Sequence, residues 1–179
     1  PMRYAHLAAI TAAREAGAIL SFDPNLRFPL WPNREQLRQT VWQFLPLTHI
    51  LKLSDEELPF LTGTEDIEAA LPTLFTGDVQ LVLFTCGSKG ARAYTRTASA
   101  RARSPKVTAV DTTGAGDAFF AGITMGLTYG KTMDEACEIG TRLSASVICT
   151  SENVCPRFLP SEFGLEPGRA AGEQLTFDI

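Results

Sequence analysis

Short, continuous apolar runs alternate with longer helical segments along the first half of this sequence. The runs cover residues 18–22, 49–53 and 79–85, and the third is the clearest β-pattern in the chain. Strands that are apolar on both faces are typical of a parallel sheet covered by helices on both sides. The alternation therefore predicts an α/β fold with a mostly parallel sheet and helices on both of its faces.

Helices are expected between these strands because apolar residues recur there at helical spacing. In residues 2–16 the apolar side chains, Ile10 among them, fall on one side, and Gly17 ends the segment. Ser54 opens another helix in a Ser-x-x-Glu capping box that Glu57 closes. Further helices are expected after Pro32-Asn33, from Thr64 or Glu65 to about Phe75, at 114–129 and at 133–150, with more exposed strands at 91–95 and 106–110.

Polar or glycine-containing segments follow the predicted strands, each at a carboxyl end. They cover residues 23–27, 52–57, 85–90 and 111–117. The carboxyl ends of parallel strands lie at one edge of a sheet, and ligands of open α/β sheets bind outside that edge. We therefore expect the four segments to converge on one ligand site.

Composition excludes several classes of function. The net charge of −4 gives no basic field for a nucleic acid, and Lys and Arg do not cluster with aromatic residues. No apolar run is long enough to span a bilayer, and the N-terminal residues do not form a secretory signal. A cytoplasmic protein that binds neither nucleic acid nor membrane is expected.

The chemistry available to the chain is also narrow. It has only two histidines, His6 and His49, which argues against a histidine-based triad or a multi-histidine metal site. Its four cysteines form no C-x-x-C pair and have no histidine at zinc spacing, so buried thiols in a reducing compartment are expected. Catalysis would therefore depend on carboxylates, backbone amides and a bound cofactor.

The strongest chemical signal is the turn Gly114-Ala115-Gly116-Asp117, which opens the helix expected at 114–129. Two glycines around a small residue allow a tight turn that exposes successive N–H groups. The positive end of the following helix favours an anion there, as phosphoryl transfer requires. Asp117, in the first helical turn, can accept a proton from a substrate hydroxyl. The turn alone is also consistent with a simple helix start carrying a favourable carboxylate.

The longer run Asp111-Thr112-Thr113-Gly114-Ala115-Gly116-Asp117-Ala118-Phe119-Phe120-Ala121-Gly122 resembles the C-terminal signature of the ribokinase-like (PfkB) carbohydrate kinases. This resemblance implies an ATP-dependent sugar kinase that uses Mg²⁺. It implies that Gly114, Ala115 and Gly116 form the anion hole for the transferred phosphoryl group, and that Asp117 is the catalytic base.

Three other segments extend the resemblance over most of the chain. Residues 22–27, followed by Leu30-Trp31-Pro32, are similar to the fructokinase branch, which implies that Asn25 and Arg27 contact sugar or phosphate. Residues 52–57 resemble the family's Asn-x-x-Glu segment. The loop at 85–90 resembles its Thr-x-Gly-x-x-Gly loop beside the nucleotide. The resemblance implies that Lys52, Thr85, Gly87 and Gly90 contact ATP, and that Glu57 binds Mg²⁺ through water.

Each of these residues also has a simpler interpretation. Asn25 and Arg27 also fit the turn chemistry that follows a strand, since Asx-Pro commonly opens a turn. Glu57 fits a capping-box carboxylate and nothing more, and Lys52 fits a solvated side chain. Gly87 and Gly90 fit a β-turn alone. These alternatives stay open at the level of the sequence.

The chain departs from the family in length and near its end. Family members are about twice as long, and the N-terminal part with the first glycine signature, most of the sugar pocket and the dimerising lid has no counterpart here. We expect residues 1–160 to be the C-terminal, ATP-binding half of a ribokinase-like domain, weak or inactive alone, with a tail at 161–179. Residues 150–157 differ from the family's usual run beside its potassium site, which would involve Asp111 and Thr113, because Arg157 adds a positive charge.

The resemblance therefore predicts a fructokinase-like enzyme that phosphorylates a primary hydroxyl of a small sugar, fructose first. A kinase for 2-keto-3-deoxygluconate is the alternative within the family, with Arg27 meeting the carboxylate of the sugar acid. A non-catalytic nucleotide-binding fragment is the alternative outside it, and a folded remnant without a ligand is the third. The family also implies a homodimer for the full-length protein.

Overall fold

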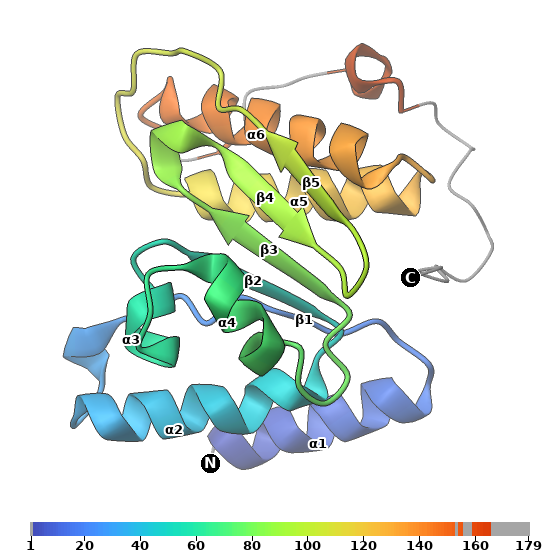
Figure 1. Ribbon diagram of the computed structural model, residues 1–179. Coiled ribbons are helices and arrows are strands. Elements are labelled where there is room, and N and C mark those ends of the chain that lie inside the picture. The colour runs from blue at the N-terminus through green and yellow to red at the C-terminus, as the bar shows by residue number, and fades with distance from the viewer. Residues whose placement is uncertain (1, 153, 156–158, 166–179) are drawn as a thin grey trace. The chain divides into compact units, whose positions relative to one another are not determined.

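The computed structural model describes residues 2–152, 154–155 and 159–165 (Figure 1). The chain divides into two compact units, Pro1–Phe84 and Thr85–Ile179. Each unit is described by itself below.

The first unit contains three strands and four α-helices. The strands are β1 (Ser21–Phe22), β2 (Ile50–Ser54) and β3 (Leu81–Thr85), which follow one another in the order β1-β2-β3. β1 pairs with β2 in parallel, with Ser21 opposite Ile50. The helices are α1 (Met2–Glu15), α2 (Arg34–Phe44), α3 (Leu58–Thr62) and α4 (Ile67–Leu74), and the 3₁₀ turns are η1 (Phe28–Leu30) and η2 (Leu45–Leu47).

The central strands of this unit are apolar on both faces, as predicted. In β2 and β3 the first four residues are all buried, and Leu51, Leu53, Val82 and Leu83 are completely inaccessible to solvent. Side-chain caps fix two helix starts: the Asn33 side chain accepts from the Gln36 N–H at α2, and Asp66 accepts from the Glu68 N–H at α4.

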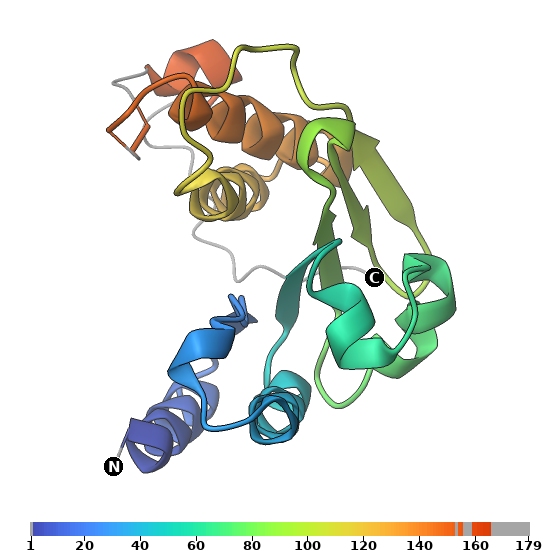
Figure 2. The same ribbon diagram turned by 90° about the vertical axis from the view of Figure 1, so that its left-hand side faces the viewer.

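The second unit consists of a β-hairpin and two long helices. β4 (Ala91–Tyr94) and β5 (Ser99–Ala102) pair antiparallel. α5 (Ala115–Thr128) and α6 (Met133–Ile148) pack along each other, and α6 also contacts both strands (Figures 1 and 2). Short 3₁₀ turns, η3 (Gly87–Lys89) and η4 (Pro160–Phe163), lie after β3 and near the end of the described chain.

The α5–α6 contact is close because glycines face the partner helix. A Cβ added to Gly140 of α6 would lie 2.8 Å from the Phe119 carbonyl oxygen of α5, and one added to Gly122 would lie 2.8 Å from the Gly140 Cα. Next to this contact, Leu165 packs with Ile139 and Leu143 of α6. The first residues of the predicted tail therefore pack on α6, whereas residues 166–179 lie outside the described part.

Three predictions about the elements are wrong. Residues 106–110 form no strand, and Val107 and Val110 are exposed; the second strand of the hairpin is β5. The helix after Ser54 begins at Leu58, because residues 55–57 form a turn. The strand expected at 18–22 shortens to Ser21–Phe22, and neither residue is buried. Among the residues that the structure describes, no helix is both long and apolar enough to cross a membrane.

Candidate functional site

The predicted site residues fall into two groups, one in each unit. In the first unit, Lys52 at β2 forms an ion pair with Asp23, which follows β1, with 2.8 Å between Nζ and Oδ2. The Lys52 and Asp23 side chains are only 9% and 15% exposed. Burial raises the pKa of Asp23 even though the ammonium group of Lys52 opposes the shift. The interpretation of Lys52 as a solvated side chain is therefore excluded.

Glu57 connects the turn after β2 to the loop after β1. Its Oε2 accepts hydrogen bonds from the Ser54 N–H at 2.9 Å and from the Ser54 hydroxyl at 3.0 Å. Its Oε1 accepts from the Leu26 N–H at 2.9 Å. The hydrogen bonds of a capping box are therefore present, but the carboxylate also binds a loop 31 residues away.

That loop contains Asn25 and Arg27 on either side of Leu26. Asn25 has a φ of 44°, and it is the one non-glycine residue in the described ranges with a positive φ. Its N–H donates to Asp23 Oδ1 at 3.3 Å, which makes Asp23 the side chain that closes the turn. Asn25 and Arg27 are both exposed, so their side chains are accessible to a ligand.

In the second unit, the glycine turn opens α5 as the sequence predicts. Gly114 is the N-cap residue in the left-handed conformation, with a φ of 80°. The Ala115 N–H donates to the Thr112 carbonyl oxygen, so one of the three amides assigned to the anion hole already has a partner within the turn. Asp117 is exposed in the first turn of the helix. Amides of a first helical turn have no partner within the helix, which leaves the Gly116 N–H well placed for an anion.

Asp111 precedes this turn and is fixed by it. Its Oδ1 accepts from the Thr113 N–H at 2.9 Å, and hydrogen bonds from Thr113 hold the pKa of Asp111 below its usual value. The backbone N–H groups of Val110 and Asp111 both donate to the Ile148 carbonyl oxygen at the end of α6. Asn153 and Arg157, in the segment that differs from the family's usual run beside its potassium site, lie outside the described residues.

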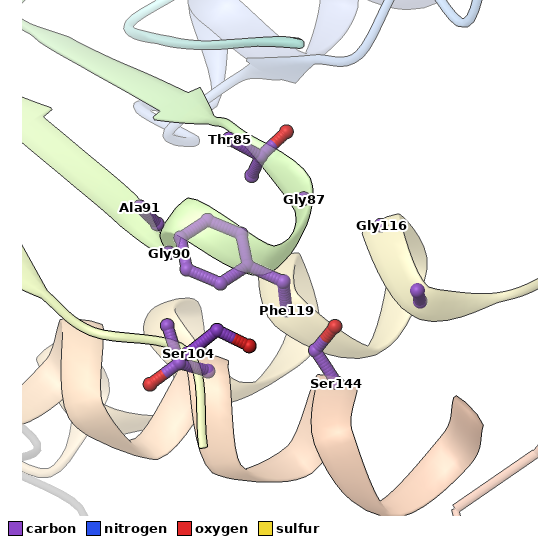
Figure 3. A pocket seen from close by; sticks show the side chains of 10 residues that line it. Thr85, Gly87, Gly90, Ala91, Ser104, Gly116, Phe119 and Ser144 are labelled. Atoms are coloured by element: carbon purple, nitrogen blue, oxygen red, sulfur yellow. The ribbon is translucent and has the colours of Figure 1, made fainter. Parts of the chain in front are cut away.

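A cavity of about 120 Å³ is lined by some of the site residues predicted in the second unit, but not by Gly114 or Asp117 (Figure 3). Thr85 contributes from the end of β3, Gly87 and Gly90 from the loop after it, and Ala115 and Gly116 from the first turn of α5. Gly90 must be glycine there, because its φ is 93° and an added Cβ would lie 2.1 Å from the Ala102 carbonyl oxygen. The nucleotide loop and the anion turn predicted from sequence therefore line one pocket.

The same cavity has walls that sequence reasoning did not assign to the site. These residues are Ala91, Ser104, Phe119, Thr141 and Ser144. Phe119 is buried, and Ser104 lies in the segment wrongly expected to lead into a strand. A signal was available for Thr141 and Ser144, whose spacing of three on a predicted helix places both on one face.

The described residues contain no group of three or more His, Cys, Asp or Glu side chains placed to hold a metal ion together. Mg²⁺ commonly keeps several water ligands and uses few protein carboxylates beside the oxygens of phosphates. The sparse set of carboxylates, with Glu57 already accepting hydrogen bonds through both oxygens, fits a water-mediated role in binding Mg²⁺.

Comparison with known proteins adds to this geometry. The sequence model described as pfkB family carbohydrate kinase matches residues 1–157. Fructokinase-2 of Solanum habrochaites is 41% identical over 179 residues, covering 98% of this chain and 53% of the relative. Probable fructokinase-4 of Arabidopsis thaliana is 38% identical over 169 residues, covering 93% of this chain and 50% of the relative.

Solved structures give the same result. A Vibrio cholerae fructokinase with bound fructose, ADP and calcium superposes with a TM-score of 0.77 at 35% identity, covering 84% of this chain and 51% of that one. A Salmonella enterica aminoimidazole riboside kinase with its riboside and an ATP analogue gives a TM-score of 0.78 at 29% identity, covering 91% and 57%. The chain thus spans about half the length of these relatives.

Proposed function

Because this chain belongs to the pfkB family of carbohydrate kinases, we propose that it carries the nucleotide-binding and phosphoryl-transfer part of an ATP-dependent sugar kinase. The reaction would move the γ-phosphoryl group of ATP to a primary hydroxyl of a sugar. Fructose is the proposed sugar, since the similar plant proteins are fructokinases and the similar Vibrio cholerae structure holds fructose. Residues 1–160 would form this functional part and residues 161–179 its tail.

The observation that carries the proposal is the shared cavity of the second unit. Its lining combines the loop with Thr85, Gly87 and Gly90 and the first turn of α5. We assign the loop to ATP and the helix start to its phosphates, because backbone N–H groups and the helix dipole favour negative charge there. Ser144 and Thr141 add hydroxyl groups to the same wall, within reach of a ligand in the cavity.

In this mechanism Asp117 accepts the proton of the attacking sugar hydroxyl. Its exposed position in the first helical turn allows a substrate to reach it. The amides of Gly114, Ala115 and Gly116 would stabilise the transferring phosphoryl oxygens. The Ala115 N–H, which donates to the Thr112 carbonyl oxygen, would then either donate to both acceptors or leave Thr112 for the phosphoryl group.

The first unit would supply groups for the metal, the phosphates and the sugar. Mg²⁺, when bound, neutralises charge on the ATP phosphates, and Glu57 would hold it through water. Lys52 would contribute positive charge for ATP from within its ion pair with Asp23. Asn25 and Arg27, both exposed, would contact sugar or phosphate. Asp111 and Thr113 remain the proposed contacts for a potassium ion.

A second candidate is a nucleotide-binding module without transferase activity. The cavity assigned to ATP is lined entirely by residues of the second unit, so nucleotide binding does not require a complete sugar site. A kinase for 2-keto-3-deoxygluconate has less support, because the similar plant proteins and the Vibrio cholerae structure are fructokinases.

Two measurements on the same preparation test the proposal. Calorimetric titration with an ATP analogue should show binding, and a coupled assay for ADP should show fructose-dependent turnover that Asp117→Asn slows by about 10²-fold or more. Binding of nucleotide without turnover would favour the module. Failure of Mg-ATP to bind or to raise the melting temperature would refute both the kinase and the module.

A further inference from the structure

None of the described residues that line the cavity of the second unit carries a charge, although the proposed ligand is an anion. The lining consists of glycines and of small, hydroxyl-bearing and apolar side chains. Asp117, which follows Gly116 in the first turn of α5, is exposed and places a negative charge beside the cavity. The chain as a whole carries a net charge of −4. Apart from the start of α5, attraction for a nucleotide must therefore come from positive charges around the cavity.

Positive charge is concentrated in one stretch of the sequence. Residues 79–110 contain six Lys and Arg residues and no Asp or Glu. The stretch includes the loop after β3, the hairpin of β4 and β5, and the segment that leads to the glycine turn. It is therefore a region of positive charge in a chain that is negative overall.

Three of these cations lie beside the cavity. Gly90 and Ser104 both line it (Figure 3); Lys89 immediately precedes Gly90, Arg103 immediately precedes Ser104, and Lys106 follows Ser104 by two positions. Consecutive Cα atoms are about 3.8 Å apart, so each of the three Cα atoms lies within about 7.6 Å of the Cα of a lining residue. A Cβ added to Gly90 would lie 3.0 Å from the Arg103 Cα, so the two segments that carry these cations are in contact.

These three cations are not neutralised by neighbours. Lys89, Arg103 and Lys106 are exposed, and none of them forms an ion pair with another described residue. At an ionic strength of about 0.1 M the field of an exposed charge extends about 10 Å, which reaches the cavity from each of them. Cations on an edge strand can serve only to prevent pairing with another sheet. All three lie outside β4 and β5, so that role does not account for them.

We propose that Lys89, Arg103 and Lys106 form a cationic rim that steers the anionic nucleotide into the cavity of the second unit. Mg-ATP keeps a net negative charge, and a cleft flanked by charge of the opposite sign raises the rate at which such a ligand associates. Charges at the rim of a site act mainly on the association rate and its salt dependence, and much less on dissociation. The inference rests on the proposed function, because it takes a nucleotide as the ligand of this cavity.

The chain offers matched variants for a test. The triple variant Lys89→Glu, Arg103→Glu and Lys106→Glu reverses the rim charge at exposed sites, so the fold should tolerate it. A second triple variant with Gln at the same positions only removes the charge. Lys131→Glu is the control in the same unit, because Lys131 follows α5, whose 14 residues separate it by about 21 Å from the glycine turn.

The experiment is stopped-flow binding of a fluorescent ATP analogue with Mg²⁺, and of the uncharged adenosine analogue that carries the same fluorophore. At an ionic strength of about 0.1 M, the Glu triple variant should slow association of the ATP analogue by about tenfold, and the Gln variant by a smaller factor. Lys131→Glu should change it by less than about twofold, since about 21 Å exceeds the screening length of about 10 Å. Association of the adenosine analogue should be the same for every variant. At about 1 M salt, where the screening length falls to about 3 Å, the variants should match the wild type for the ATP analogue too.

Each contrary result has its own meaning. If the ATP analogue binds and the Glu triple variant associates within about twofold of the wild type, the steering inference is wrong and the proposed function stands. Equal slowing of the adenosine analogue would show that the three residues shape the cavity and do not steer. Faster dissociation with unchanged association would show that they hold the nucleotide by direct contact. If the wild type binds neither analogue, this inference and the proposed function both fail.

Discussion

Replacing Glu57 by Gln tests whether this carboxylate positions the loop with Asn25 and Arg27 or acts only through a metal ion. Glu57 is 8% exposed, and its carboxylate receives three hydrogen bonds, two on Oε2 from Ser54 and one on Oε1 from the Leu26 N–H. A Gln side chain has one carbonyl oxygen, so its amide group must face donors on one side. Either the link to Ser54 or the link to Leu26 is therefore lost.

The size of the effect follows from these contacts. A hydrogen bond to a charged group contributes about 1.5–3 kcal/mol, and an unsatisfied buried N–H costs about 1–3 kcal/mol. The anchored loop also contains Asn25 in the left-handed conformation, which asparagine adopts more readily than most residues. We expect Glu57→Gln to lower the free energy of unfolding by about 2 kcal/mol.

The assay is urea denaturation of the isolated chain in EDTA, with Glu56→Gln as the exposed neighbouring control. If Glu57 positions the loop, Glu57→Gln should lower the free energy of unfolding by the full amount, about 2 kcal/mol, even without a metal ion. The substitution should also weaken the binding of fructose more than it weakens the binding of Mg-ATP. If Glu57→Gln unfolds like the wild type in EDTA and differs only when Mg²⁺ is present, the carboxylate acts through the metal and the argument from Leu26 is wrong.

Three further predictions concern the second unit. Asp117→Asn should leave ATP binding intact and slow transfer to fructose by about 10²-fold or more, measured by calorimetry and an ADP assay. Gly140→Ala should lower the urea midpoint by the equivalent of about 1–3 kcal/mol, because its Cβ would meet the Phe119 carbonyl oxygen at 2.8 Å. Hydrogen bonds from Thr132 lower the pKa of Glu135, so its stabilising effect is present above pH 4.5 and lost as pH falls through the lowered value. Glu135→Gln should accordingly flatten the acid limb of a stability–pH curve.

The local sequence pattern correctly predicted the strands whose own residues are apolar at consecutive positions. The runs that became β2 and β3 are apolar at consecutive positions and are buried on both faces. The hairpin was harder, because β5 consists of Ser, Ala and Arg and pairs through small residues, with Ala100 and Ala102 buried. Residues 106–110 carry two valines with β-propensity, but no neighbouring strand pairs with them in the described structure. Propensity without a partner does not make a strand.

In the candidate site, too, some residues can be identified from the sequence, whereas others are brought there only by the packing of the fold. Gly114 and Gly90 could be identified because a required positive φ favours glycine in the sequence itself. Ser104 and Phe119 could not, since packing brings them to the cavity from separate elements. The contact between Glu57 and Leu26 joins residues 31 positions apart, and a capping-box motif accounts for only its local part. Pro59, in the first turn of α3, fits a helix that starts at Leu58 after that motif.

The disagreement over residues 18–22 has a different cause. This run has the composition of an interior strand, yet Ser21 is exposed and Phe22 is only half-buried. A strand becomes interior when both of its edges and both of its faces are covered, and β1 has β2 on one edge. The apolar side of α1 shows the same mismatch, because its residues follow a helical pattern but none is buried. The two mismatches occur on elements that line one cavity, so the burial of these residues cannot be read from their own pattern.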